Sequence, residues 1–257
     1  MEKNGTKQEQ IQKVVVREFE VRDEKEVQRI FSEGMEEMVI DTAFRGLRHH
    51  PESLLLYLAI TVSCLWVSWC PWLIVFLPVA ILCARYFYSL RTTNSYTKRT
   101  LSTDMANIEH FYMRAPGSCL WVALLDGVVV GLVAAMKRSL EVVELKRMSV
   151  DRRYRCCGVG MALGQKVLEF ASSQKYSKVI LGTTNYTPAA HNLYRRLGFH
   201  CVGVTNGYHA DSTGPGPSFL EWLFYRVCHH HYELKVQQKH IDFHYNGCSQ
   251  ILQSRIY

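Results

Sequence analysis

Several patterns that would assign a function quickly are missing from this sequence of 257 residues. None of its nine cysteines forms a C-x-x-C pair, and their number is odd. This usage argues against a zinc site or a disulfide framework and favours reduced thiols in a protein that faces the cytosol. The sequence also lacks the G-x-G-x-x-G dinucleotide fingerprint and the Gly-Lys-Ser/Thr of a P-loop. The net charge of +7 comes without a tract that mixes basic and aromatic residues, so we expect no nucleic-acid partner.

Three adjacent histidines, His229–His231, suggest a metal site at first sight. Neighbouring side chains of an extended strand point to opposite faces of the sheet, so these three do not converge on one ion. We therefore expect no metal.

Charged residues are absent from Ser53 to Ala84. A charge-free run longer than about 18 residues is typical of a membrane helix, and a buried core helix is the alternative. One straight helix of this length would reach roughly 48 Å, beyond a hydrocarbon core of about 30 Å, and Pro71 and Pro78 interrupt the run. Both flanks are basic, which places both ends in the cytosol by the positive-inside rule. We expect a bent hairpin that enters the membrane and returns, in preference to a single span.

A basic turn that contains glycines joins a strand to a helix in the middle of the chain. Val142–Val150 favours a strand, Asp151–Arg155 a turn, and Met161–Ser173 a helix. Gly158 and Gly160 let the backbone curl and present N–H groups at the positive end of the helix, which suits a phosphate or pyrophosphate. An ordinary strand–turn–helix with glycines is the alternative.

Strands and helices alternate along the remaining chain. We expect strands at 14–19, 119–125, 128–135, 178–181, 200–204 and 227–236, and helices after Asp23, at Asp104–Met113 with Thr103 as its cap, and at Pro188–Leu197. This order predicts an α/β domain with a mixed central sheet flanked by helices. We expect a disordered lead at 1–13, a domain made of 14–50 and 100–236, the hydrophobic membrane insert 53–84 between the first and second helices, and an unstructured tail at 237–257.

Two motifs resemble the GCN5-related N-acetyltransferase (GNAT) family. Arg155-Cys156-Cys157-Gly158-Val159-Gly160 resembles its Arg/Gln-x-x-Gly-x-Gly/Ala loop, although the two cysteines replace the usual small or basic pair. Ala190–Phe199 resembles its A-x-x-L-Y-x-x-x-G-F segment, although Thr187 stands where many members carry Asn. The resemblance implies the GNAT fold, with acetyl-CoA as the acetyl donor. It implies cofactor contacts by Met148, Val150, Arg155, Gly158, Val159, Gly160 and Asn192.

Further segments resemble a membrane-bound subgroup of this family that acetylates L-aspartate. They are TAFRGLR (42–48), TDMANIEHFYM (103–113), PGSCLWVALLDGVVVG (116–131), VELKRMSVD (143–151) and LGTT (181–184). The resemblance implies transfer of the acetyl group of acetyl-CoA to the amine of L-aspartate. It also implies residence at the endoplasmic reticulum membrane with the catalytic domain facing the cytosol; a mitochondrial membrane is the alternative.

The resemblance also assigns two catalytic roles. Glu144 lies where histone-acetylating members keep a general base, and an ion pair with Lys146 or Arg147 is the alternative. Tyr194 resembles the general acid that protonates the leaving sulfur of CoA, and packing against the cofactor is the alternative. A strand N–H near Met148 would hold the oxyanion.

An acceptor that carries carboxylates requires guanidinium groups in its site. Arg45 and Arg147 are our candidates. Glu144 and Arg147 are three residues apart and face opposite sides of an ideal strand, so a bulge is needed to bring them together. The alternatives are another amine, such as a cysteine S-conjugate or a protein lysine, and a membrane protein that binds acetyl-CoA without turning it over.

Overall fold

The computed structural model describes residues 13–45, 51–68, 72–206, 224–225 and 227–236. The expected tail at 237–257, and all but the last residue of the expected lead at 1–13, lie outside these ranges.

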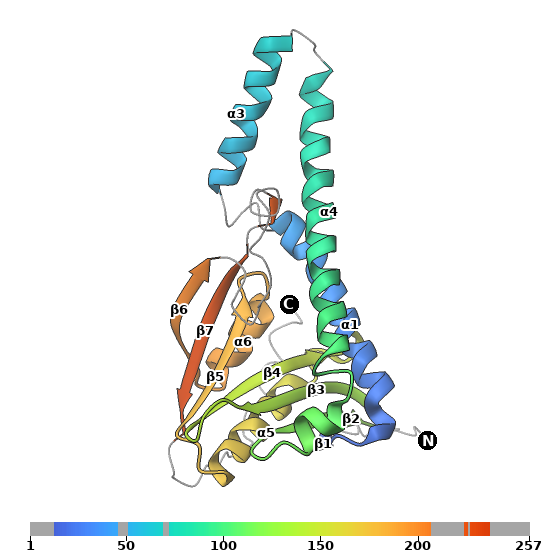
Figure 1. Cartoon of the computed structure of the whole chain (residues 1–257), viewed down its shortest axis with the longest axis vertical. Helices are drawn as coiled ribbons and strands as arrows, with labels where there is room; N and C mark the ends of the chain where they lie inside the picture. Colours follow the sequence, from blue (N-terminus) through green and yellow to red (C-terminus); the bar gives the residue numbers. More distant parts are fainter. Residues whose placement is uncertain (1–12, 46–50, 69–71, 207–223, 226, 237–257) are drawn as a thin grey trace, which may run out of the picture.

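A mixed sheet of seven strands forms the base of the molecule (Figure 1). Its strands are β1 (Val15–Glu18), β2 (Cys119–Leu125), β3 (Val128–Lys137), β4 (Val142–Val150), β5 (Lys178–Thr184), β6 (His200–Asn206) and β7 (Cys228–Lys235). Their order across the sheet is β1-β2-β3-β4-β5-β7-β6. Only β4 and β5 pair in parallel; the other neighbours are antiparallel.

Helices cover both faces of this sheet because its central strands are apolar on both faces. In β2, Leu120 and Val122 pack into a core with α1 (Glu24–Ile40), whereas Trp121 and Ala123 pack into a core with α5 (Val159–Ser173). The shorter α6 (Pro188–Arg196) lies beside α5. The sheet is thus the middle layer of an α/β sandwich, as the sequence predicts.

A long helix occupies residues 85–102, where the sequence pattern predicts none. Helix α4 (Leu73–Ser102) runs from the hydrophobic segment into the domain, where it packs along α1 (Figure 1). There the hydroxyl of Ser89 donates to the carbonyl of Val39 at 3.0 Å, and Arg85 Nε donates to the carbonyl of Ala43 at 3.0 Å. The expected end of the insert at Ala84 therefore falls inside one continuous helix.

The helix predicted at Asp104–Met113 is wrong over its first half. Thr103 ends α4 instead of starting a helix, and its hydroxyl donates to the carbonyl of Arg99 at 2.8 Å. A turn follows, and only η3 (Glu109–Met113), a short π-helix, is helical. The turn forms because the Asp104 carboxylate is held by the Arg147 guanidinium, a contact that local propensity does not contain.

Helix α3 (Pro51–Ser68) and the first half of α4 form a helical hairpin that projects from the domain (Figure 1). A five-residue π-helix, η2 (Asp41–Arg45), ends α1 just before it. Among the helices, as far as the structure describes them, none is both long and apolar enough to cross a membrane. A hairpin is present, but this finding gives the expected membrane insertion no support.

Candidate functional site

Strands β4 and β5 separate after their first three residues and open the sheet. They pair only from Val142 and Lys178 to Glu144 and Ile180, whereas both strands continue further. Their outer edges stay paired, β4 with β3 and β5 with β7. The edge of β4 after Glu144 therefore presents backbone groups without a strand partner, and a polar ligand can take that place.

This separation opens a cleft of about 1930 Å³. One side is formed by β4 and the start of α5, the other by the ends of β5 and β7 with α6, and α1 and α4 form a third wall. The cleft brings together predicted site residues from β4, from the glycine loop with the start of α5, and from α6; these are Glu144, Arg147, Met148, Val150, Arg155, Gly158, Val159, Gly160, Asn192 and Tyr194. Arg45 ends η2, and only its backbone lies among the described residues.

The glycine loop presents an anion site at the start of α5. Gly158 precedes the helix in the left-handed region at φ 79°, which glycine adopts at little cost. The first intrahelical donor here is Ala162, whose N–H bonds to the Gly158 carbonyl, so the N–H groups of Val159, Gly160 and Met161 precede the helical ladder. A Cβ at Gly160 would lie 3.2 Å from Leu193 of α6, so Leu193 would have to shift by a few tenths of an ångström to admit a side chain.

Several predicted cofactor residues lie at the cleft with partners of their own. The guanidinium of Arg155 pairs with Glu37 of α1 at 2.7 Å and donates to the Val150 carbonyl at 3.1 Å. Asn192 accepts from Arg195 at 2.8 Å. The residues present fit an acetyl-CoA substrate: the open β4 edge suits its amide-bearing arm, and the N–H groups of the loop suit its pyrophosphate.

Glu144 lies at the point where the two strands separate. Its carboxylate is hydrogen-bonded by the Arg138 guanidinium, and Lys146 Nζ lies 3.7 Å away. The alternative that the sequence leaves open, an ion pair with Lys146, is thus present, and Arg138 adds a second cation. Glu144 and the cations around it line the cleft.

Tyr194 lies on the α6 side of the cleft. It is buried, and its ring packs 6.0 Å from the rings of Phe199 and Tyr232. Within the described part of the chain its hydroxyl has no hydrogen-bond partner. Burial raises the pKa of Tyr194 above its ordinary value, so the phenol keeps its proton and can act as a donor.

A bulge in β4 turns Arg147 toward the same face as Glu144. Arg147 has φ 55°, and the register with β3 shifts between Leu132 and Ala134. Its guanidinium donates to both carboxylate oxygens of Asp104 at 2.8 and 2.9 Å and to the Tyr96 hydroxyl at 2.5 Å. The bulge that would bring Glu144 and Arg147 together is therefore present, and Arg147 is already held by the protein.

Sequence reasoning missed the partners of Arg147. Asp104, Tyr96 and Tyr112 lie more than 30 positions from Arg147 along the chain, and the Tyr112 hydroxyl also bonds to the Asp104 carboxylate. The sequence signal for this cluster is weak: Asp104 is one acidic residue in a polar stretch, and its burial is not visible in the sequence. The three adjacent histidines do not share one location: His229 and His231 line the cleft, while the His230 ring packs 4.8 Å from His191. Among the described residues, no group of three or more acidic, histidine or cysteine side chains could hold a metal ion.

Comparison with known proteins agrees with this geometry. The family model described as the acetyltransferase (GNAT) family matches residues 84–199. N-acetylaspartate synthetase from Homo sapiens is 46% identical over 227 residues, which cover 88% of this chain and 74% of that protein. The enzyme of the same name from Danio rerio is 43% identical over 91% of this chain and 83% of that protein. N-acetyltransferase 8 from Mus musculus is 37% identical over 73% of this chain and 85% of that protein.

The chain belongs to the GNAT family and is an acetyltransferase. Its sheet, glycine loop and cleft form the GNAT fold, which confirms the fold predicted from the two motifs.

The buried pair between Asp104 and Arg147 makes stability depend on pH in a defined direction. Burial alone would raise the pKa of Asp104, but the hydrogen bonds and charge of Arg147, with the Tyr112 hydroxyl, outweigh it and lower this pKa. Such a carboxylate stabilises the fold above its unfolded pKa of about 4, and that stabilisation is lost as the pH falls through the lower folded value. We expect Asp104→Asn to lower the free energy of unfolding at pH 7 by about 1–3 kcal/mol, and this deficit to shrink below pH 4.

Urea unfolding at a series of pH values measures this difference. Glu169→Gln is the control, because that carboxylate is exposed and its contact with Lys166 is a surface pair at 3.4 Å; its effect should be near zero. A deficit for Asp104→Asn that is equal at pH 7 and pH 3 would show that the charge of Asp104 is unimportant.

Proposed function

We propose that this acetyltransferase moves the acetyl group of acetyl-CoA to the amine of L-aspartate, giving N-acetyl-L-aspartate and CoA. Two observations support the proposal. Relatives at 43–46% identity carry the name N-acetylaspartate synthetase. The cleft wall on β4 carries Lys146 and Arg147, with Arg138 of the preceding turn beside them, and this concentration of positive charge suits a dicarboxylic acceptor.

Glu144 and Tyr194 carry the chemistry in this proposal, from opposite walls of one cleft. Glu144 accepts a proton from the aspartate ammonium, through water, so that the neutral amine attacks the thioester carbonyl. A backbone N–H of the open β4 edge near Met148 stabilises the oxyanion that forms. The C–S bond then breaks, and Tyr194 donates its proton to the departing CoA thiolate. Arg147, oriented by Asp104 and Tyr96, binds a carboxylate of the acceptor, and Arg45 is a second candidate for this role.

Turnover by the detergent-purified protein tests the proposal. We expect CoA release with L-aspartate, but not with L-glutamate, S-benzylcysteine or a lysine peptide. Because proton transfer by a placed side chain contributes about 10²–10⁴-fold, Tyr194→Phe should lower kcat about a hundredfold or more and leave the KM values nearly unchanged. Tyr232→Phe is the matched control: this tyrosine also lines the cleft, but its hydroxyl is bonded to His191.

Other outcomes separate the rival functions. CoA release only with the cysteine conjugate or the peptide would replace aspartate with another amine and keep the mechanism. Binding of acetyl-CoA without release of CoA to any amine would indicate a non-catalytic protein. Equal losses in Tyr194→Phe and Tyr232→Phe would remove the acid role of Tyr194.

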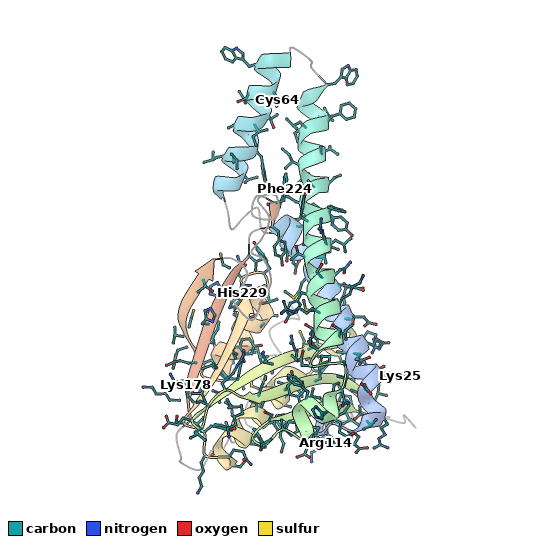
Figure 2. The ribbon with its side chains drawn as sticks, in the orientation of Figure 1. Lys25, Cys64, Arg114, Lys178, Phe224 and His229 are labelled. Atoms are coloured by element: carbon teal, nitrogen blue, oxygen red, sulfur yellow. The ribbon has the colours of Figure 1, made fainter. Side chains whose placement is uncertain are left out.

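We further propose that the α3–α4 hairpin holds the enzyme at the endoplasmic reticulum membrane, or at a mitochondrial membrane, with the domain on the cytosolic side. Apolar side chains project from both helices of the hairpin (Figure 2). Trp66 is 82% exposed, Trp72 70%, Leu55 66% and Phe76 64%. Exposed apolar surface of this extent is rare on soluble domains and marks an interaction site, and basic residues flank it on both sides.

Flotation with phospholipid vesicles tests the membrane proposal. We expect the wild-type protein to float and a Leu58→Arg/Phe76→Arg double variant to remain at the bottom, since charge opposes burial in hydrocarbon. Val128→Arg/Leu140→Arg is the control, because these two exposed apolar residues lie outside the hairpin, at the start of β3 and in the turn between β3 and β4. If both double variants float as the wild type does, the hairpin does not anchor the protein.

A further inference from the structure

Three buried threonines on the α1–α4 wall have hydroxyls that the protein does not use. Thr42 of η2 is 4% exposed, and Thr93 and Thr100 of α4 are 4% and 3% exposed. All three line the cleft. Within the described ranges none of their hydroxyls has a hydrogen-bond partner. These three hydroxyls are not enclosed by protein but open into the cleft. Hydroxyls on an otherwise buried wall usually have a partner, from the protein or from a molecule in the cleft, so their lack of a protein partner requires a reason.

Helix geometry does not provide that reason, since other hydroxyls of the same helices pair with the backbone. Ser95 of α4 donates to the Arg91 carbonyl at 2.8 Å, and Thr61 of α3 donates to the Tyr57 carbonyl at 2.8 Å. This i−4 bond is the usual choice of a hydroxyl inside a helix. Thr93 has the same option and does not take it.

Comparison of Thr93 with its neighbour Thr92 distinguishes the effect of burial from the effect of access to the cleft. Thr92 is also 4% exposed and its hydroxyl also lacks a partner, but it is closed off from solvent and does not line the cleft. The two neighbours thus differ in one property, which is whether a bound molecule can reach the hydroxyl.

Arg147, which lines the same cleft, indicates what that molecule carries. Of the five N–H groups of a guanidinium, Arg147 uses one to Tyr96 and two to Asp104. Two remain for an anion, and the Arg147 side chain is 11% exposed at the cleft. Hydroxyl and guanidinium donors that line the same cleft together suit a carboxylate.

We propose that Thr42 and Thr93 donate hydrogen bonds to a carboxylate of the acceptor, so that the α1–α4 wall helps to select acidic amino acids. The inference rests on the proposed function, because it names how that acceptor is held. The two threonines are binding residues and take no part in proton transfer.

Steady-state kinetics of isosteric variants test the inference. Valine keeps the shape of threonine and removes the hydroxyl. Thr42→Val and Thr93→Val should each raise the KM for L-aspartate about tenfold, the loss typical of a hydrogen bond to a charged group, with the KM for acetyl-CoA unchanged. Thr93→Ser should restore the aspartate KM, because serine keeps the hydroxyl. Thr92→Val, the matched control, should behave as wild type.

The opposite results are equally definite. Wild-type aspartate KM values in both Thr42→Val and Thr93→Val would overturn the inference while leaving aspartate as the acceptor. An equal rise in Thr92→Val, or no recovery in Thr93→Ser, would also overturn it, because packing would then explain the effect. If the wild-type protein does not acetylate aspartate, the proposed function is wrong and this inference is wrong with it. No result with the threonine variants would by itself overturn the proposed function.

Discussion

The separation of β4 from β5 after Glu144 and Ile180 is the constraint on which the rest of the site depends. Parallel strands normally pair along their full length, and each unpaired backbone group that is buried costs free energy. Here the outer edges of both strands remain paired, so the sheet stays intact while its centre opens. The open edge, the loop N–H groups and the two catalytic candidates all border the resulting cleft.

The bulge at Arg147 connects this opening to the third wall. Without the bulge, an alternating strand would turn Arg147 away from Glu144. With it, the guanidinium reaches Asp104 and Tyr96, and these contacts join the end of α4 to the central strand. One contact cluster thus fixes the turn after α4, the position of the α4 wall and the orientation of a cation in the cleft. The hairpin includes the first half of that same helix, so the proposed membrane anchor and the proposed acceptor wall share one continuous helix.

Local sequence signals predicted the elements whose determinants are local. Strands β2 and β4 have the predicted bounds, because their apolar runs end at a turn or at the glycine loop. The two GNAT motifs located the loop and α6. The first half of the helix expected at Asp104–Met113 is a turn instead, because a long-range ion pair stabilises the turn and helix propensity does not include such a contact. The sequence could not show that the hydroxyls of Thr42 and Thr93 lack a hydrogen-bond partner within the described ranges, because this depends on how α4 packs along α1.

Hydrogen exchange of the backbone amides, with and without acetyl-CoA, tests the central claim most directly. If the separated strands and the glycine loop form the cofactor site, acetyl-CoA should slow exchange at residues 145–150 and 158–161. Exchange in the β1–β2 ladder, at the edge of the sheet away from the β4–β5 opening, should stay unchanged. Unchanged exchange along β4 and the loop at saturating acetyl-CoA, or slowing confined to another part of the chain, would contradict the account.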